Sequence, residues 1–486
     1  MRRAATVCLL LLCAATRAFA GTPPTRTQTL LIECRTPGEL RARLEAYADS
    51  TFGRDSFGSG EACAVLGASF SRSGARDSAL AWCTRALDRR GDTEDRLAVA
   101  DLLLDRRRGD DVARVTAQLR KYLEAIEAPG ARAPYQARLA WALHLAARSD
   151  TAAAMFAEIE GDLASSLEWS ARMGRTALAA GRPGAAMRWL MPVAMASRGL
   201  AADIMDSLNA AAAAMPAGSP RRDLAALVAG QVAALDREQA RRLDAFHARR
   251  VTFNADDGFP LAGAWLAPAD SARHLGAVVL LEPGGDPTVC DSLAGALLRA
   301  NLAVLLLDRR GSGASVGPAC PTPFAWHGRE EALDRRCARD VRDGLRALAR
   351  ATPLDTSRYV VAGIGEAATT AVRAALLDPR ARALLLVSPS PHPVDRGVVR
   401  AGIAKLQRPI FFQLAPEDFL LFELTDVLYQ AGLRPVSRVS DSHGGGQGAA
   451  QFRDDPAIAP RLIRWLAETL PPPARPVPRP ARRRRR

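Results

Sequence analysis

The sequence predicts an all-α region followed by an α/β domain in which helices cover both faces of a mostly parallel sheet. Three observations support this fold class. From about Thr36 to Asp244 the pattern is helical and rich in alanine, leucine and arginine. From Val251 onward, short apolar strands alternate with helices, which is typical of a parallel sheet. Near Val360 a buried strand breaks into a glycine turn that runs directly into a helix.

The first twenty residues have the pattern of a cleavable secretory signal. This pattern consists of a basic start, a short apolar run and an A-x-A-like end: Arg2 and Arg3, Val7 to Leu12, and Ala18-Phe19-Ala20. A lipoprotein signal would use Cys13, but the preceding Leu12 is bulky where a small residue is required. We therefore expect residues 1–20 to be removed and the protein to be periplasmic or secreted. No later stretch is apolar for long enough to cross a bilayer.

Most of the positive charge lies at the two ends of the chain. Of the formal net charge of +14, three positive charges lie in residues 1–20 and seven in residues 471–486, which leaves +4 for the rest. The tail 471–486 is rich in proline and arginine and contains no acid, so we expect it to be disordered. A solvated tail is the first expectation, and contact with an anionic surface is the alternative. Nucleic acid is not the partner we expect.

Six cysteines remain outside the expected signal: Cys34, Cys63, Cys83, Cys290, Cys320 and Cys337. An even number of cysteines in an exported protein permits disulfides. Cys320 and Cys337 bracket one long loop of the α/β domain, so this pair is the expected disulfide. The cysteine spacing does not resemble a zinc site, and we expect neither a metal nor a cofactor.

The helical region, which we place at residues 28–245, shows a weak internal repeat. Leu66, Phe70 and Ala79 recur 34 residues later as Ala100, Leu104 and Ala113. This period, together with Leu66-Gly67 and Ala79, resembles the tetratricopeptide repeat family. Further degenerate copies are expected at Ala140-Trp141 with Ala153, and at Met173-Gly174 with Gly181 and Ala186.

Two roles for this helical region remain open. Helix pairs that bury one apolar face against their neighbours form arrays, and such arrays usually bind peptides or partner proteins in a concave groove. The alternative is a helical arm that packs on the second domain. The sequence offers no aromatic or charged stripe that would decide between a protein or peptide partner and simple packing.

The α/β domain is expected to span residues 250–470. Its expected strands are Val251–Phe253, Leu261–Leu266, Ala277–Leu281, Ala303–Leu307, Arg358–Ala362, Ala383–Val387, Ile410–Leu414 and Pro435–Val439. Its expected helices are Asp291–Ala300, Glu330–Ala349, Glu366–Leu377 and one near Ala457–Thr469. In such sheets the active crevice lies at the carboxyl ends of the strands.

Several short motifs of this domain resemble the α/β-hydrolase superfamily, in particular its esterase and peptidase-like members. They are Glu282-Pro283-Gly284-Gly285 after the third strand, Asp308-Arg309-Arg310-Gly311-Ser312-Gly313-Ala314-Ser315 after the fourth, and Asp355-Thr356-Ser357-Arg358 before the fifth. The second motif closely resembles the family's D-x-R-G-x-G-x-S loop. The first stands where the family has an H-G-G-like loop whose backbone N–H helps to hold an oxyanion.

The resemblance also assigns the catalytic positions. The segment Gly363-Ile364-Gly365-Glu366-Ala367 corresponds to the family's G-x-S-x-G elbow, so Gly365 stands where the nucleophilic serine belongs. Asp418 and His443 fall where the acid and the base of the triad are expected. The implied oxyanion donors are the backbone groups of Gly285 and Glu366.

Glycine at position 365 has no hydroxyl, so covalent acyl transfer cannot begin there. Loss of the nucleophile lowers turnover by a factor on the order of 10⁶ in a serine protease. We therefore expect an exported hydrolase-fold protein that binds or scaffolds without catalysis. The alternative is an ester or peptide hydrolase in which Glu366 or a water held by His443 acts directly, or which uses a displaced nucleophile such as Ser388 or Ser442.

Overall fold

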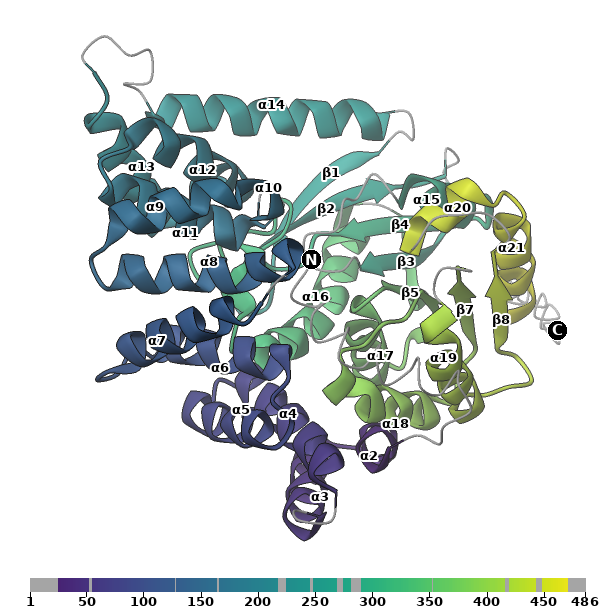
Figure 1. Ribbon diagram of the computed structural model, residues 1–486. Coiled ribbons are helices and arrows are strands. Elements are labelled where there is room, and N and C mark those ends of the chain that lie inside the picture. Colours follow the sequence, from purple (N-terminus) through teal and green to yellow (C-terminus); the bar gives the residue numbers. More distant parts are fainter. Residues whose placement is uncertain are drawn as a thin grey trace, which may run out of the picture.

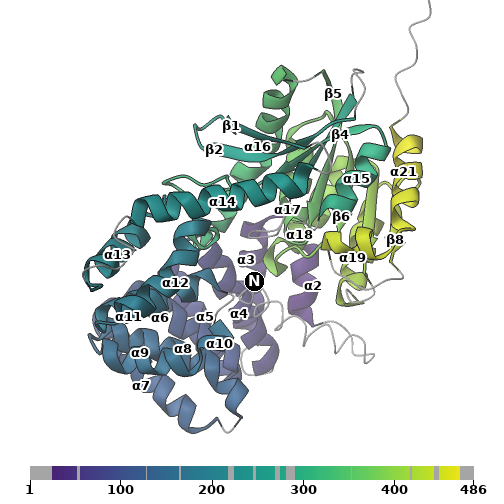
Figure 2. The ribbon, with the colours of Figure 1, turned by 90° about the horizontal axis from the view of Figure 1, so that it is seen from above.

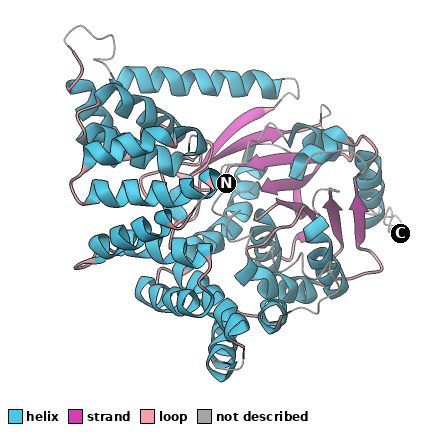
Figure 3. Ribbon diagram, viewed as in Figure 1, coloured by secondary structure: helices cyan, strands magenta, loops and turns pink. Residues whose placement is uncertain are grey.

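The computed structural model consists of an array of helices followed by an eight-stranded sheet that is flanked by helices (Figures 1 and 3). The structure describes residues 25–51, 55–126, 128–163, 166–216, 224–244, 248–268, 274–280, 290–351, 353–415, 419–442 and 448–470. Within these ranges no helix is both long and apolar enough to span a membrane. The expected signal and the arginine-rich tail lie outside the described residues.

The array contains only helices, as the sequence predicts. They are α2 (Arg26–Glu33), α3 (Pro37–Thr51), α4 (Ser56–Arg72), α5 (Arg76–Arg90), α6 (Thr93–Arg106), α7 (Asp111–Glu124), α8 (Pro129–Leu145), α9 (Ser149–Glu158), α10 (Glu160–Leu163), α11 (Leu167–Ala179), α12 (Pro183–Ala196), α13 (Ala202–Ala213) and α14 (Leu224–Asp244). Seen from above, the array lies beside the sheet domain, and the long helix α14 leads from one to the other (Figure 2).

Glycines allow close approach within two of the helix pairs. A Cβ atom at Gly67 of α4 would lie 2.3 Å from Cys83 Sγ of α5, and one at Gly174 of α11 would lie 2.4 Å from Leu190 Cγ of α12. Any side chain at either position would therefore push the paired helices apart. Both glycines belong to the positions on which the resemblance to the tetratricopeptide repeat rests.

The 34-residue offset holds in the first helix of each pair and fails in the second. Leu66, Ala100 and Leu104 are buried, as a shared contact face requires. In α7, however, Ala113 is exposed, and Val115 and Leu119 form the buried face. The expected equivalence of Ala79 and Ala113 is wrong, because α7 turns a different stripe toward its neighbours. The tetratricopeptide resemblance itself stays a prediction.

The sheet has the strand order β1-β2-β4-β3-β5-β6-β7-β8. The strands are β1 (Arg249–Asn254), β2 (Pro260–Leu266), β3 (His274–Leu280), β4 (Leu302–Leu307), β5 (Leu354–Ile364), β6 (Ala381–Val387), β7 (Ile410–Leu414) and β8 (Arg438–Asp441). The β1–β2 and β2–β4 pairs are antiparallel and all the others are parallel. The prediction of a mostly parallel sheet is confirmed.

Helices cover both faces of this sheet. They are α15 (Asp291–Arg299), α16 (Glu330–Ala351), α17 (Ala367–Leu377), α18 (Arg396–Leu406), α19 (Phe419–Ala431), α20 (Gln451–Asp454) and α21 (Ile458–Thr469). Alternate residues of each strand enter different cores. In β5, Val361 packs with residues of α16 and α17, whereas Val360 and Ala362 pack with residues of α15 and α21. Alternate side chains of a strand point to opposite faces of the sheet. Because helices cover both faces, the strands are apolar on both sides.

The last predicted strand is misplaced. Pro435–Val439 was expected as a strand, but β8 begins only at Arg438, and the Val436 N–H donates to the Leu433 carbonyl in a turn (3.3 Å). Val436 and Val439 are both exposed, so their apolar character does not reflect a core-facing strand. Proline, which has no N–H to donate to the neighbouring strand, belongs to this turn.

The predicted disulfide between Cys320 and Cys337 is also wrong. All six cysteines outside the first twenty residues are buried thiols. Cys320 and Cys337 belong to one apolar cluster with Phe259, Trp326 and Leu333. They contribute to packing there as small apolar side chains. Burial raises the pKa of the Cys337 thiol to about 12.

The array packs against the sheet domain along the loop between β4 and α16. Arg198, which follows α12, donates through Nε to the Gly313 carbonyl (3.1 Å). His327 Nδ1 lies 3.8 Å from Glu168 Oε2 of α11. Phe324 packs against the cluster formed by α11 to α14. On this side, the array is therefore a helical arm packed on the neighbouring domain, which is the second of the two expected roles.

Candidate functional site

The bend at the end of β5 has the backbone of a strand–turn–helix elbow. β5 ends at Ile364, Gly365 has φ = +60°, and α17 begins at Ala367. A φ value of this kind favours glycine over residues with a Cβ. At Gly363 a Cβ would lie 2.7 Å from the Ala367 carbonyl oxygen, so glycine there lets the helix start close to the strand. The predicted elbow position is thus found at the carboxyl end of a central strand.

Backbone hydrogen bonds hold Gly365 against the neighbouring strand β6. The Gly365 N–H donates to the Val387 carbonyl at 3.0 Å, and the Ser390 N–H donates to the Gly365 carbonyl at 3.2 Å. Gly365 is buried. The elbow is therefore firmly placed, but its central residue presents only hydrogen at the point where a nucleophile would project.

Glu366 follows the elbow glycine and is half-buried. Burial raises the pKa of its carboxyl group, the nearby Arg72 and Arg309 lower it, and Asp395 and Asp334 raise it further. Its backbone N–H belongs to the first turn of α17, where N–H groups have no partner inside the helix. The role of the Glu366 N–H as an oxyanion donor stays a prediction.

An ion pair joins the array to the elbow side of the sheet domain. Arg72, the last residue of α4, donates through Nη2 to Asp395 Oδ2 at 2.8 Å. Asp395 lies in the short helix η3 (Pro393–Asp395) that precedes α18. Its side chain is only 7% exposed. Burial raises the pKa of Asp395, and the guanidinium groups of Arg72 and Arg373 oppose this rise.

From Asp395 the charged network continues to α17 and α16. Arg373 Nη2 lies 3.4 Å from Asp395 Oδ1, and Arg373 Nη1 also bonds to Asp334. Asp334 accepts a hydrogen bond from the hydroxyl of Thr370, one turn beyond Glu366. The array is thus linked through alternating charges to the first turns of the elbow helix.

Ser388 lies directly after β6, the strand next to the elbow. It follows β6 and has φ = +43°, an uncommon conformation for a residue other than glycine. Its Oγ accepts hydrogen bonds from Gln451 Nε2 at 2.8 Å and from the Gly448 N–H at 3.2 Å. Gln451 also accepts from Gln413 Nε2. Ser388 therefore belongs to a buried polar network that joins β6, β7 and α20.

Ser442 lies farther from the elbow than Ser388. Its N–H donates to the Leu414 carbonyl at the end of β7 (2.9 Å), and it follows β8. β8 is the third strand beyond β5 in the sheet, so about 14 Å separates their axes at the usual strand spacing. Ser442 is therefore held at the ends of β7 and β8, and its role as a displaced nucleophile stays a prediction.

The remaining predicted site residues lie outside the described part of the chain. These are Asp418, His443 and Gly285. The structure does place the strands that precede them: β3 ends at Leu280, β7 at Leu414 and β8 at Asp441. All three strands end at the same edge of the sheet as β5, because they run parallel to it. The roles of Asp418, His443 and Gly285 stay predictions.

The motif after β4 has a structural role. Arg310 is buried and pairs with Asp257 and with Asp340, with Nη–Oδ distances of 2.8 and 2.6 Å. Asp308 Oδ2 accepts from the Ala314 N–H at 2.9 Å, which closes the loop. Arg310 therefore fixes this loop against the helix α16 and the turn between β1 and β2. Arg309 of the same motif lies close enough to Glu366 to lower the pKa of its carboxyl group.

The array contains a stripe of arginine and tryptophan that the sequence analysis missed. Arg172 Cζ lies 4.5 Å from the ring centre of Trp169 and 5.5 Å from that of Trp141. Arg138 Cζ lies 5.8 Å from the Trp169 ring, and Arg138 Nη2 bonds to Asp101 at 2.6 Å. The sequence pattern that could have predicted this stripe is the spacing R-x-x-W in α8 and W-x-x-R in α11. Each spacing places both side chains on one face of a helix.

The described residues contain no group of three or more His, Cys, Asp or Glu side chains arranged to hold a metal ion. Near the elbow the described part offers backbone N–H groups, the Glu366 carboxyl, the Ser388 hydroxyl and, two residues after Ser390, the His392 imidazole, whose pKa burial lowers.

No protein-family model and no curated protein matches the sequence. Solved structures do resemble its C-terminal part. A predicted CIB-like hydrolase from Thermoplasma acidophilum is 12% identical, with a TM-score of 0.37, and the match covers 46% of this chain and 98% of that one. The esterase domain of a Rhodothermus marinus protein is 16% identical, with a TM-score of 0.34 and the same coverages. An esterase from Pyrococcus furiosus is 17% identical, with a TM-score of 0.37, covering 46% and 93%.

At such low identities and TM-scores these neighbours say nothing about activity. The strand order, the antiparallel β2 and the elbow between β5 and α17 define the class of the domain. The C-terminal domain has the α/β-hydrolase fold, and an N-terminal helical region precedes it.

Proposed function

We propose that this protein is an exported, non-catalytic member of the α/β-hydrolase fold class, which binds a ligand or partner without turning it over. One observation carries the proposal. The elbow backbone is intact, with φ = +60° and a hydrogen bond to β6, but the residue at its tip is Gly365. A serine hydrolase needs an attacking oxygen at this point, and the chain has none there.

The surroundings of the elbow support a binding role. Ion pairs of Arg373 with Asp334 and Asp395 lie beside it, and Arg72 of the array also pairs with Asp395. The groups that would complete a triad, Asp418 and His443, have a second use in such a protein, because an acid–imidazole hydrogen bond can join two loops. The helical array then supplies the surface for a protein or peptide partner.

Hydrolysis of short p-nitrophenyl esters by the purified mature chain tests the proposal. We expect no turnover above the rate in buffer, and the variant His443→Ala should behave like the parent chain. Turnover well above buffer that His443→Ala abolishes would overturn it. The N-terminal sequence of the exported protein tests cleavage near Ala20 in the same preparation.

A displaced-nucleophile hydrolase is the second candidate, and the conformation of Ser388 favours it. Residues held in sparsely populated backbone conformations cluster at functional sites. Ser388 has φ = +43° on the strand next to Gly365. Against this role, its Oγ accepts two hydrogen bonds, which reduces the electron density available for attack.

A fluorophosphonate probe separates the two candidates. Labelling that disappears in Ser388→Ala would establish Ser388 as a nucleophile and replace the non-catalytic proposal. Absence of labelling, together with absence of ester and amide turnover, would remove the second candidate. Ser357, which is exposed and lies before the core of β5, provides the matched control Ser357→Ala.

A further inference from the structure

Helix α14 is poorly covered by the rest of the molecule. Among its described side chains, only Leu224 and Val228 near its start are buried. Further along the helix, Leu235 is 49% exposed. A helix at the end of an array normally presents a polar outer face. An exposed leucine in the middle of this helix therefore indicates a surface that another element can cover.

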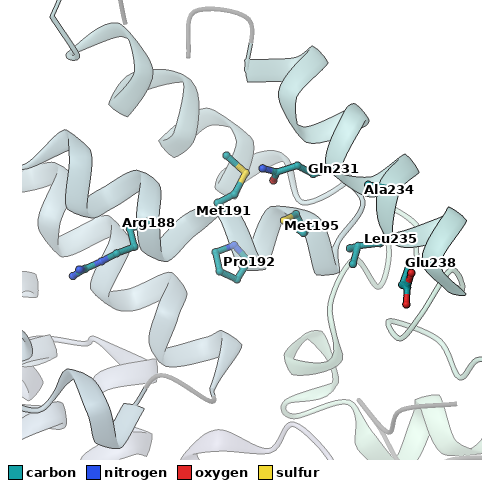
Figure 4. Close-up of a pocket in the computed structure, with 8 residues that line it drawn as sticks. All are labelled: Arg188, Met191, Pro192, Met195, Gln231, Ala234, Leu235 and Glu238. Atoms are coloured by element: carbon teal, nitrogen blue, oxygen red, sulfur yellow. The ribbon is translucent and has the colours of Figure 1, made fainter. Parts of the chain in front are cut away.

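A groove of about 530 Å³ lies between α14 and α12 (Figure 4). Its walls consist of Arg188, Met191, Pro192 and Met195 from α12, and of Gln231, Ala234, Leu235 and Glu238 from α14. Both walls repeat the spacing i, i+3, i+4, i+7, which selects one face of each helix. The residue numbers rise in the same direction along the two walls (Figure 4).

The middle of the groove is apolar and adaptable. Met191 and Met195 have flexible thioether side chains that fit different partner shapes. Pro192, inside α12, has no N–H for the Arg188 carbonyl, so the wall contains a backbone acceptor without its usual helical bond. The buried amide oxygen of Gln231 is a second acceptor, since none of the described residues donates to it.

Opposite charges mark the two ends of the groove. Arg188 lies at one end and Glu238 at the other (Figure 4). Both charges already have partners within the chain: Arg188 pairs with Glu160 at 2.9 Å, and Glu238 pairs with Arg241 at 3.5 Å. The side chains of Arg188 and Glu238 are 60% and 49% exposed, and such surface pairs exchange partners at little cost. A helix has a partial positive charge at its N-terminus and a partial negative charge at its C-terminus. The groove is therefore complementary to a helix whose N-terminus lies at Glu238 and whose C-terminus lies at Arg188.

We infer that this groove binds an amphipathic helix of a partner protein, which runs antiparallel to α12 and α14. The helix presents apolar residues at i, i+3, i+4 and i+7 to the methionines and Leu235, with basic residues near its N-terminus and acidic residues near its C-terminus. The inference rests on the proposed binding function and assigns it a surface.

Two features of the chain argue against an occupant from within it. The tail 471–486 is interrupted by prolines and carries arginines instead of an apolar stripe, so it cannot supply this helix. It also follows α21, which lies on the far side of the sheet from α12 and α14 (Figure 1).

Fluorescence anisotropy with two labelled synthetic peptides tests the inference on the mature full chain. Both peptides form three helical turns with leucine at i, i+3, i+4 and i+7. One has lysine at its N-terminal end and glutamate at its C-terminal end, and the other has these charges exchanged. We expect the first peptide to bind about tenfold more tightly, because only its charges match Glu238 and Arg188. The double variant Arg188→Glu/Glu238→Arg should reverse the preference.

The variant Leu235→Asp should weaken binding of the first peptide by at least about tenfold, because a carboxylate would enter the apolar contact. Leu377→Asp is the matched control, since Leu377 is 57% exposed on α17, away from the groove. Circular dichroism confirms that each variant is folded.

The inference is overturned if neither peptide binds saturably, if both bind equally, or if Leu235→Asp and Leu377→Asp weaken binding alike. A dimer that Leu235→Asp dissociates would identify a second copy as the occupant and would also overturn it. Ester turnover that depends on His443 would contradict the non-catalytic proposal alone. Failure of peptide binding without turnover would contradict the groove alone.

Discussion

Arg72 of the helical array and Asp395 of the sheet domain form an ion pair of 2.8 Å across 323 positions of sequence. The pair lies beside the elbow, because Arg72 also acts on the pKa of Glu366. Removing one partner of a buried ion pair leaves the other charge without compensation, whereas exposed pairs contribute little. This contact is therefore one of those that hold the array against the sheet domain, together with the contacts of Arg198 and His327.

We expect Arg72→Met to lower the free energy of unfolding by about 2 kcal/mol, less than for a fully buried pair, because Asp395 retains Arg373. Urea denaturation provides the measurement. Arg76→Met is the matched control, since Arg76 is exposed at the start of α5. If both variants lie within about 0.5 kcal/mol of the parent chain, the pair does not hold the array in place.

Substitution of Gly365 separates backbone strain from chemistry. Gly365→Ala and Gly365→Ser should each lose about 1 kcal/mol of stability, because a Cβ disfavours the left-handed conformation at φ = +60°. The serine variant alone regains an attacking oxygen, so we expect it to hydrolyse p-nitrophenyl esters faster than the alanine variant. Equal rates for the two variants would show that the other triad groups are not competent.

The carboxyl group of Glu94 should make stability depend on pH. Burial raises its pKa from 4.5 to about 7 in the folded chain. The folded state therefore holds the proton more tightly than the unfolded state, and stability falls as pH rises from about 4.5 to about 7. Glu94→Gln removes this loss and should stabilise the protein above this range by roughly 1 kcal/mol, after allowance for partial exposure.

Thermal unfolding of Glu94→Gln and of the parent chain across this range measures the effect. The two should unfold at similar temperatures on the acid side and diverge on the alkaline side. Glu124→Gln, at the exposed end of α7, provides the control. A constant difference between Glu94→Gln and the parent at every pH would contradict the assignment.

The arginine-rich tail gives a prediction about an anionic surface. Seven guanidinium groups in residues 471–486 should bind vesicles that contain anionic lipid at low ionic strength and release them near physiological salt, where the Debye length is about 8 Å. Co-sedimentation measures this binding, and a chain that ends at residue 470 is the control. Equal binding by both chains would place the anionic contact elsewhere.

Local patterns were sufficient to predict most of the sheet domain. β6, β7 and α17 follow the expected ranges closely, because apolar strands bounded by glycine or proline have few alternatives. β8 was misplaced because the valines beside Pro435 imitate a strand pattern at an exposed edge. The elbow was predicted from Gly363 and Gly365, because a glycine turn between a buried strand and a helix can be recognised in the local sequence.

The contacts between distant parts of the chain could not be predicted. Nothing in the neighbourhood of Arg72 indicates a partner in η3, since the pairing depends on how the array docks. The same holds for the stripe of Arg138, Trp141, Trp169 and Arg172, which needs α8 and α11 side by side. The groove between α12 and α14 likewise depends on the angle at which the last helix leaves the array.

The reaction rate of each buried thiol measures how often the structure around it opens. Cys34 lies under the contact between α2 and α18, where a Cβ on Gly397 would collide with its carbonyl oxygen, whereas Cys83 lies between α4 and α5. A thiol-specific reagent modifies each sulfur only while its surroundings are separated. The labelling rate at Cys34 therefore reports how often the contacts among α2, α3 and η3 open, and the rate at Cys83 reports how often a helix pair within the array comes apart.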